Sequence, residues 1–428
     1  MIEADLAIVG IAELATPTGK SARTGSELGR LQVIQDAAVA CRGEEIIFVG
    51  SRRDLTQAVR LDPRGMTIDA AGGTVLPGFV DAHTHLPFAG WREREFDERL
   101  RGTTYSEIAA RGGGILSTVS QTRAATAEQL RELVRGRLDD LLKLGTTTVE
   151  AKSGYGLSLA DELKQLNALR DAGRGHPVEI VPTFLGAHTV PNEYRPRREE
   201  YVKLLIDRVV PEVARHGLAE YADAFVDANA FSLDEARRVL TAAREHGLGV
   251  RLHADQLADD GGAMLAAELG AASADHLEFS SEAGIEALAR AGTCGVLLPA
   301  ATFFLMMEAR PPGRKLVEAG VPVVVATDFN PGSCPADSMG AALWFACLSA
   351  RLTVDEAITA STLNAAHTLG RADRIGSVER GKRANLVVHR MPNRYHLVYR
   401  FGRPRVAQVI VGGKLAYQSG ARSSTLNL

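Results

Sequence analysis

The chain has 428 residues, of which 45% are hydrophobic and 24% are charged. These values are ordinary for a globular protein, and the length accommodates one barrel with an accessory domain. The formal net charge of −3 provides no basic field, so nucleic acid is not expected as a partner. The four cysteines form no CxxC pair, which argues against a disulfide scaffold or a thiolate metal site and fits a reducing compartment.

Neither a signal peptide nor a membrane-spanning segment is expected from the sequence. Its start carries Glu3 and Asp5 and lacks the basic residues and apolar stretch of a signal peptide. The longest mostly apolar stretch, 294–307, is too short to cross a bilayer and contains Pro299. We therefore expect a cytoplasmic protein with no membrane partner.

Both ends of the chain predict short strands rather than helices. In the first 73 residues and in the last fifty, brief apolar runs are broken by glycine and charged residues. Long helical patterns are missing from both regions. The predicted end strands are 6–9, 37–40, 46–49, 384–389, 406–411 and 414–417.

The middle of the chain alternates strand-like runs with helical stretches, which is typical of a parallel α/β fold. Helical patterns cover, for example, 127–144, 233–246 and 261–269. Eight strands are predicted, the number that closes a TIM barrel, with a flat doubly wound sheet as the alternative. The eight are 74–80, 146–151, 179–185, 221–226, 249–253, 274–278, 293–298 and 322–327.

Polar side chains follow several of these strands at the end where barrel enzymes carry their chemistry. His83 and His85 follow the first strand one residue apart, so both project from one face. His253 ends the fifth strand and Asp328 follows the eighth. Three imidazoles and one carboxylate form a plausible site for a divalent metal with room for a water, whose pKa the ion would lower.

Further polar residues follow the other strands. His188 follows the third strand and His276 lies on the sixth. A single histidine often only caps local backbone groups, but five histidines converging on one barrel face with an aspartate favour a site. We expect Asp328 to accept a proton from the water. His276 is expected to polarise a substrate carbonyl or to shuttle a proton.

Lys152 raises the question of a second metal. Some binuclear barrels bridge two ions with a carboxylated lysine from a central strand near the fourth. Lys152 instead follows the second strand, and the fourth ends in Val226 and Asp227. We therefore expect one metal ion, with Lys152 as a structural residue or charge partner near it.

The motifs resemble those of the amidohydrolase superfamily over nearly the whole chain. Residues 77–85, Pro-Gly-Phe-Val-Asp-Ala-His-Thr-His, resemble its first-strand motif, and 353–370 and 375–388 resemble its late helix and its return into a small β domain. Thr353 and Glu356 also fit a capping box. The resemblance implies a TIM-like (β/α)8 barrel over 74–379 and a small β-sandwich domain formed jointly by 1–73 and 380–428.

A narrower resemblance, to the imidazolonepropionase family, rests on five segments: 88–92, 150–156, 183–188, 253–256 and 327–333. It implies hydrolysis of the cyclic amide C–N bond of 4-imidazolone-5-propanoate to N-formimino-L-glutamate, the third step of histidine degradation. It also implies a homodimer. The metal ligands carried over are His83, His85, His253 and Asp328. The substrate contacts carried over are Arg92, Tyr155, His188, Gln256, Asn330, Gly332 and Ser333.

The residue chemistry agrees with that resemblance. An arginine such as Arg92 can hold a propanoate carboxylate with two parallel hydrogen bonds. Gln256 forms hydrogen bonds but cannot act as a general base, which leaves the catalytic proton transfers to Asp328 and His276. The ligand set accepts either zinc or iron.

Two other functions are compatible with parts of the pattern. A different mononuclear amidohydrolase or aminohydrolase, acting on a purine, pyrimidine or triazine ring, would share the metal residues but would not need Arg92. A non-catalytic barrel serving as an assembly scaffold would be expected to lose metal ligands, and here all four are present.

Overall fold

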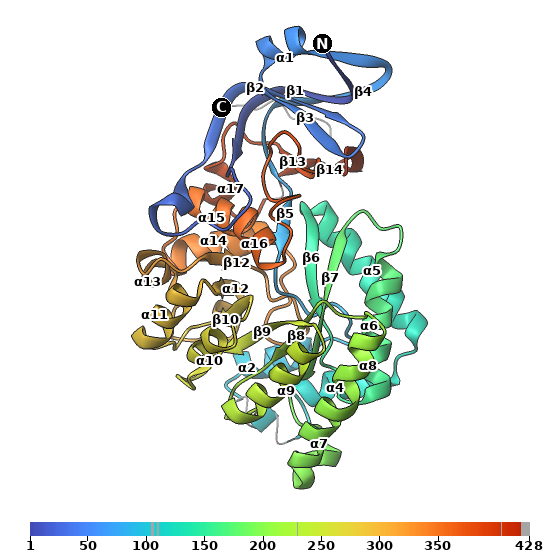
Figure 1. Cartoon of the computed structure of the whole chain (residues 1–428), viewed down its shortest axis with the longest axis vertical. Coiled ribbons are helices and arrows are strands. Elements are labelled where there is room, and N and C mark those ends of the chain that lie inside the picture. The colour runs from blue at the N-terminus through green and yellow to red at the C-terminus, as the bar shows by residue number, and fades with distance from the viewer. Residues whose placement is uncertain (104–106, 109–110, 229, 404, 421–428) are drawn as a thin grey trace.

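In the computed structural model of the chain, the described residues are 1–103, 107–108, 111–228, 230–403 and 405–420. They form two sheets, one of eight strands and one of seven. Figure 1 shows the eight-stranded sheet surrounded by helices, with the seven-stranded sheet at one end of the molecule beside both chain termini. Within the described residues, no helix combines the length and apolar character that crossing a membrane requires.

The eight-stranded sheet is a parallel barrel, as predicted. Its hydrogen-bonded order runs from β12 to β5 with every neighbour consecutive in the chain, whereas a doubly wound sheet would reverse its order at a switch point. The ring closes just past the strand ends, where Thr84 pairs with Phe329 in a parallel bridge. The strands are β5 (Phe79–Asp81), β6 (Thr146–Lys152), β7 (Glu179–Ala187), β8 (Tyr221–Ala224), β9 (Gly249–Ala254), β10 (Ser273–His276), β11 (Cys294–Leu297) and β12 (Val323–Val325).

The first barrel strand differs from its predicted range, 74–80. Thr74 to Pro77 belong to the seven-stranded sheet, as the end of β4 (Val59–Pro77), and only β5 belongs to the barrel. Gly78 makes the transition, because its N–H donates to the carbonyl of Asn385 and a Cβ there would lie 2.4 Å from the Thr147 hydroxyl. One apolar run therefore serves two sheets, which a hydrophobicity pattern does not reveal.

Helices surround the barrel, and their starts follow local sequence rules. Capping boxes open α5 (Ala127–Lys143), α9 (Leu233–Glu245) and α15 (Val354–Ala360), the last at the predicted Thr353. Between β5 and β13, the other α-helices whose bounds lie within the described residues are α2 (Glu93–Leu100), α4 (Ile115–Ala124), α6 (Leu159–Gly173), α7 (Arg198–Leu204), α8 (Val210–Arg215), α10 (Gly262–Glu268), α11 (Glu282–Ala291), α12 (Pro299–Phe304), α13 (Gly313–Glu318), α14 (Met339–Ser349) and α16 (Leu363–Thr368).

The seven-stranded sheet joins the two chain ends, as expected from the resemblance. Its order is β15-β14-β13-β4-β1-β2-β3, so strands from the C-terminal end lie against β4. Apolar side chains from both halves share one core, for example Ile8, Val39, Leu386 and Ile410. The remaining elements here are β1 (Ile2–Thr16), β2 (Gln32–Arg42), β3 (Glu45–Ser51), α1 (Arg52–Ala58), β13 (Leu386–His389), α17 (His396–Tyr399), β14 (Val406–Val411) and β15 (Lys414–Gln418).

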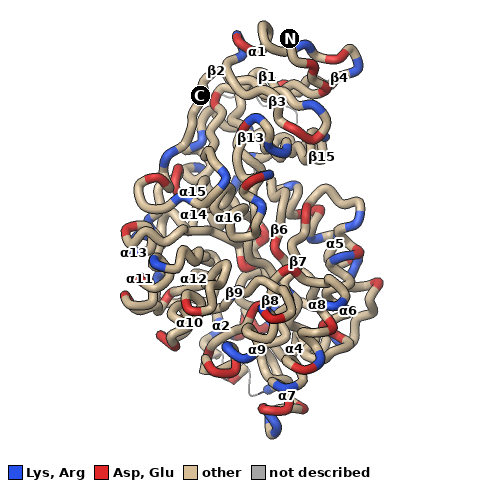
Figure 2. Tube along the Cα trace, in the orientation of Figure 1, with Lys and Arg blue, Asp and Glu red and all other residues tan. Residues whose placement is uncertain are grey.

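Charged residues are distributed over both parts of the molecule. Figure 2 shows Lys and Arg interspersed with Asp and Glu along the surface helices and in the small sheet. This mixture agrees with the small net charge of −3. The charged groups that position the candidate site are a separate set, buried inside the barrel.

Candidate active site

Three histidines meet at the C-terminal end of the barrel, as predicted. His83 and His85 follow β5, and His253 lies near the end of β9. Each offers one ring nitrogen such that the three atoms lie within 4.8 Å of one another. All three residues are buried, with exposed fractions of 0%, 3% and 4%. Strands that are far apart in the sequence thus place three imidazole rings in one compact cluster.

Asp328 joins this cluster from the end of β12, the strand beside β5 where the barrel closes. Its Oδ1 lies 3.5 Å from Nε2 of His83 and 3.5 Å from Nε2 of His85. Its backbone N–H donates to the carbonyl of His83 at 3.0 Å, which ties the end of β12 to that of β5. The residue has a φ of +58°, a strained conformation for a non-glycine residue that is often kept at functional sites.

The donor atoms fit a divalent metal ion. His83 Nδ1 lies 2.6 Å from Asp275 Oδ2, and among the described residues its other nitrogen, Nε2, has no hydrogen-bond partner. Burial, followed by nearby charges such as Lys152, lowers the pKa of His83 well below its usual value. Burial does the same for His85. Neutral imidazoles beside a carboxylate are the ligand forms that zinc and iron bind.

A buried ion network lies beneath the histidines. Lys152 Nζ lies 2.9 Å from Glu150 Oε1, 2.9 Å from Asp223 Oδ2 and 3.8 Å from Asp275 Oδ2. Asp223 in turn faces His253 Nδ1 at 3.1 Å. Lys152 therefore neutralises the carboxylates that orient His83 and His253. It is a charge partner near the site, as expected, and carboxylates of this kind set the orientation of ligating histidines.

Charge pairing overcomes burial at the centre of this network. Burial alone would lower the pKa of Lys152, but Asp223 and Glu150 raise it above its usual value. Burial would raise the pKa of Asp223, but His253 and Lys152 hold it well below the usual range. Lys152 and Asp223 are therefore charged at neutral pH. The roles of Asp223, Asp275 and Glu150 were missed from sequence because each looks like an ordinary polar residue on a strand.

His276 reaches the same cluster from β10, as predicted. Its ring centroid lies 5.3 Å from that of His253 and 5.7 Å from that of His83. Burial lowers its pKa to about 3. Glu278, which sequence reasoning passed over, lies beside it, and burial raises the pKa of this carboxyl to about 7. The signal that could have found Glu278 is a carboxylate two residues after a strand-end histidine.

Tyr155 and His188 form one wall of the site. The His188 ring stacks on His85 at 5.4 Å, and Tyr155 lies 5.3 Å from His188. The carbonyl of Gly154, whose φ of +104° suits glycine, lies 3.0 Å from His188 Nδ1. Buried Glu162 holds this loop by accepting three backbone N–H groups, from Gly154, Gly156 and Leu157.

The loop after Asp328 is organised by Asn330. Its side-chain amide donates to the carbonyl of Asp328 at 2.6 Å and to the Ser333 hydroxyl at 2.8 Å. Its Oδ1 accepts the backbone N–H groups of Gly332 and Ser333. The donors expected to face a substrate are thus engaged within the loop, where they fix the backbone beside Asp328.

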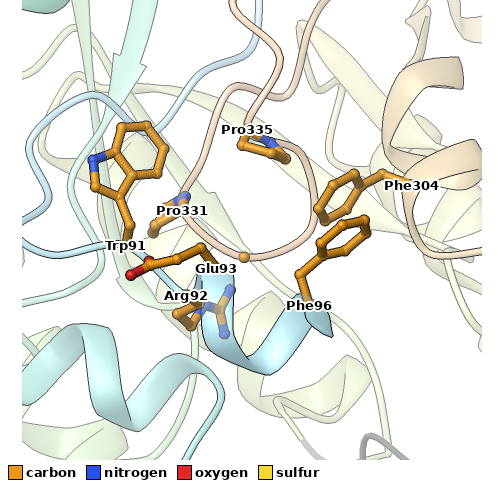
Figure 3. A pocket seen from close by; sticks show the side chains of 8 residues that line it. Trp91, Arg92, Glu93, Phe96, Phe304, Pro331 and Pro335 are labelled. Atoms are coloured by element: carbon orange, nitrogen blue, oxygen red, sulfur yellow. The ribbon is translucent and has the colours of Figure 1, made fainter. Parts of the chain in front are cut away.

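Arg92 lies at a cavity of about 370 Å³ near the barrel mouth. Figure 3 shows it among Trp91, Pro331 and the paired rings of Phe96 and Phe304. Its side chain is only 8% exposed, and its nearest acidic oxygen, on Glu95, is 4.0 Å away. Its Nε atom is buried without a hydrogen-bond partner among the described residues. A buried guanidinium without a close carboxylate is suited to hold an acidic ligand.

Gly332 and Gln256 complete the predicted set. A Cβ on Gly332 would lie 1.0 Å from the Arg92 guanidinium, so only glycine lets the arginine pack here. Gln256 follows β9 and is partly buried. No hydrogen bond or ring contact between described residues joins Gln256 to the histidine cluster.

Comparisons with known proteins find relatives over nearly the whole chain. Curated relatives named imidazolonepropionase include those of Symbiobacterium thermophilum, 49% identical over 97% of this chain and 98% of the relative, and Geobacillus kaustophilus, 47% identical over 95% and 97%. The relative from Alkaliphilus metalliredigens is 42% identical over 97% of this chain and 99% of its own.

Solved structures share the fold at lower identity. A triazine hydrolase variant matches with a TM-score of 0.73 and 20% identity, over 96% of this chain and 94% of its own. A Xanthomonas campestris adenosine deaminase with bound zinc matches with a TM-score of 0.67 and 19% identity, over 98% and 95%. The model of the amidohydrolase family matches residues 74–416. The chain therefore belongs to the amidohydrolase family.

Proposed function

We propose that the chain hydrolyses the cyclic amide C–N bond of 4-imidazolone-5-propanoate, giving N-formimino-L-glutamate in histidine degradation. The observation that carries this proposal is the presence, at one barrel end, of a buried histidine cluster and a buried arginine without a close acidic partner. Arg92 is near enough to be among the charges that, after burial, lower the pKa of His85. The 49% identical relative, matched over nearly its whole length, is named for this reaction.

His83, His85, His253 and Asp328 would hold one divalent metal ion, zinc or iron. Bound there, the ion would supply Lewis acidity that lowers the pKa of a water and polarises the substrate carbonyl. The chain's own contribution is to bury the three imidazoles and to orient their ring nitrogens toward one another. Asp275 performs this task for His83, because the 2.6 Å contact at Nδ1 leaves Nε2 for the ion.

The substrate is held by residues around the cluster. Arg92 binds the propanoate carboxylate from the barrel mouth, where the low exposure of its side chain strengthens the ion pair. Tyr155 and His188 contact the ring and fix its orientation next to His85. Gln256, Asn330, Gly332 and Ser333 are the remaining substrate contacts of this proposal, and Asn330 also holds its loop in one conformation.

The reaction adds one water across the ring amide, so a C–O bond forms, the C–N bond breaks, and a proton moves from the water to the departing nitrogen. Asp328 accepts that proton, since its Oδ1 lies 3.5 Å from Nε2 of both His83 and His85, at the point where the histidines converge. His276 lies beside the same point and is the second group able to carry a proton. Gln256 takes no part in proton transfer because an amide is not a base.

Arg92→Ala tests the substrate assignment against an aminohydrolase that acts on an uncharged ring. We expect KM for imidazolone propanoate to rise about 100-fold in this variant, the scale of a lost charge-assisted contact, with a smaller change in kcat. Arg94→Ala is the matched control, because Arg94 is an exposed arginine in the first turn of α2, the helix that Arg92 immediately precedes. An unchanged KM in Arg92→Ala would count against the proposed substrate.

We also propose that the protein works in the cytoplasm as a homodimer. Light scattering of the purified chain tests the dimer, for which a mass near twice 45.7 kDa is expected. A mass of one chain would contradict the proposed homodimer.

A further inference from the structure

Two buried polar atoms beside the histidine cluster face each other, and neither has a hydrogen-bond partner among the described residues. They are His276 Nδ1 and Glu278 Oε2, 3.9 Å apart, on side chains that are 2% and 1% exposed. This separation is longer than a hydrogen bond and too short for a water between them. Since buried donors and acceptors without partners are costly, a small rotation that closes the gap is favourable. Contacts of this kind also tighten when a substrate binds.

The backbone holds the two residues in this arrangement. His276 and the following Leu277 both have positive φ, +84° and +72°, which makes a tight left-handed turn after β10. The N–H of Leu277 donates to the carbonyl of Ala254 at 3.0 Å, and that of Phe279 donates to Asp255 at 2.9 Å. The turn is therefore fixed to the end of β9, which also carries the metal-site residue His253.

A third side chain aims the Glu278 carboxylate. Thr302, on α12, donates its hydroxyl to Glu278 Oε1 at 2.6 Å. One carboxylate oxygen is thus held, and the other, Oε2, points at the His276 ring. A carboxylate held next to one nitrogen of a catalytic imidazole fixes the tautomer of that ring and stabilises its protonated form.

We infer that Glu278 is a positioning residue for His276: it accepts the Nδ1–H and leaves Nε2 as the proton acceptor that faces the substrate. This inference rests on the proposed function, and it selects between the two roles open to His276. An Nε2 without a proton cannot donate to the substrate carbonyl. His276 therefore shuttles the one proton that the water loses: Asp328 accepts it first, His276 takes it from Asp328 at Nε2, and it is released to the departing ring nitrogen with no other change in the imidazole ring.

Two substitutions at Glu278 separate orientation from charge. In Glu278→Leu we expect kcat for imidazolone propanoate to fall about 100-fold, the scale of one proton-transfer group, with KM within about twofold of wild type. Glu278→Gln keeps an oxygen that accepts the Nδ1–H, so a loss of about tenfold is expected. Metal content should match wild type in both. A raised KM with unchanged kcat would overturn the inference, because Glu278 would then bind substrate.

A double-mutant cycle tests whether Glu278 acts through His276. In a His276→Asn background, adding Glu278→Leu should cause no further loss of kcat. The same loss in both backgrounds would contradict the inference. If the wild type itself does not turn over the substrate, the proposed function fails instead.

A spectroscopic measurement completes the test without any turnover. The 15N NMR shifts of labelled histidine, assigned with His276→Asn, should show His276 protonated at Nδ1 in the wild type and in Glu278→Gln. A mixture of tautomers is expected in Glu278→Leu. An Nε2-protonated ring in the wild type would overturn the inference even if the leucine variant does not fold.

Discussion

The barrel centre buries charged side chains, whereas the core of the seven-stranded sheet buries apolar ones. In the barrel, Lys152, Glu150, Asp223 and Asp275 are all fully buried below the histidine cluster. In the sheet, one buried cluster is made of side chains such as Ile8 and Leu386. Buried charges are weak evidence for stability, because desolvation offsets their attraction. The comparison indicates that the buried charges of the barrel centre serve the chemistry of the site, whereas the apolar core of the sheet contributes stability.

Removing the central charge should have the largest effect. In Lys152→Met, two carboxylates at 2.9 Å lose their partner inside the barrel. We expect the free energy of unfolding to fall by about 3–5 kcal/mol, measured by urea denaturation. The control is Lys143→Met, since Lys143 pairs with Asp140 at 2.8 Å on the surface. Equal stability of the two variants would remove the contrast between the barrel centre and ordinary surface pairs.

A truncation in the sheet should affect stability alone. Leu386 is fully buried on β13, where Val387 pairs with Leu76 of β4. In Leu386→Ala we expect a loss of about 2–4 kcal/mol in the free energy of unfolding, from lost burial and the cavity left behind. Metal content and kcat of the folded variant should equal those of wild type. A fall in metal affinity without unfolding would show that the sheet also supports the site.

His389 should make stability depend on pH, with an effect that is the smallest of the three near neutral pH. Burial lowers its pKa to about 3 in the folded protein, against about 6.5 in an unfolded chain. Below pH 6.5 the unfolded state therefore binds more protons, and stability falls as the pH drops, by about a factor of ten in the unfolding constant per pH unit. His389→Leu should lose this component between pH 6.5 and 4.5. An unchanged pH dependence would contradict the burial of a neutral ring.

Much of the architecture was predictable because local rules carry it. The eight barrel strands follow from apolar runs between helical patterns, and the ends of these strands mark the site, including His83, His253 and Asp328. The capping box at Thr353 is a purely local signal, and it is present in the structure. These features depend on a few neighbouring residues, which the sequence displays directly.

The rest depends on contacts between distant residues. The split at Gly78 is decided by Thr147 and Asn385, which no local pattern links to it. Asp275 becomes the partner of His83 only because β10 and β5 face each other across the barrel. Glu278 was read as the end of a strand, yet the left-handed turn at Leu277 brings it beside His276.

The most direct test of the account is an assay of the metal-loaded protein with 4-imidazolone-5-propanoate, following loss of the ring absorbance and identifying the product by mass spectrometry. We expect N-formimino-L-glutamate to form, one divalent ion per chain, and turnover to stop when a chelator removes that ion. A folded protein that binds the ion and leaves the substrate intact would contradict the proposed reaction.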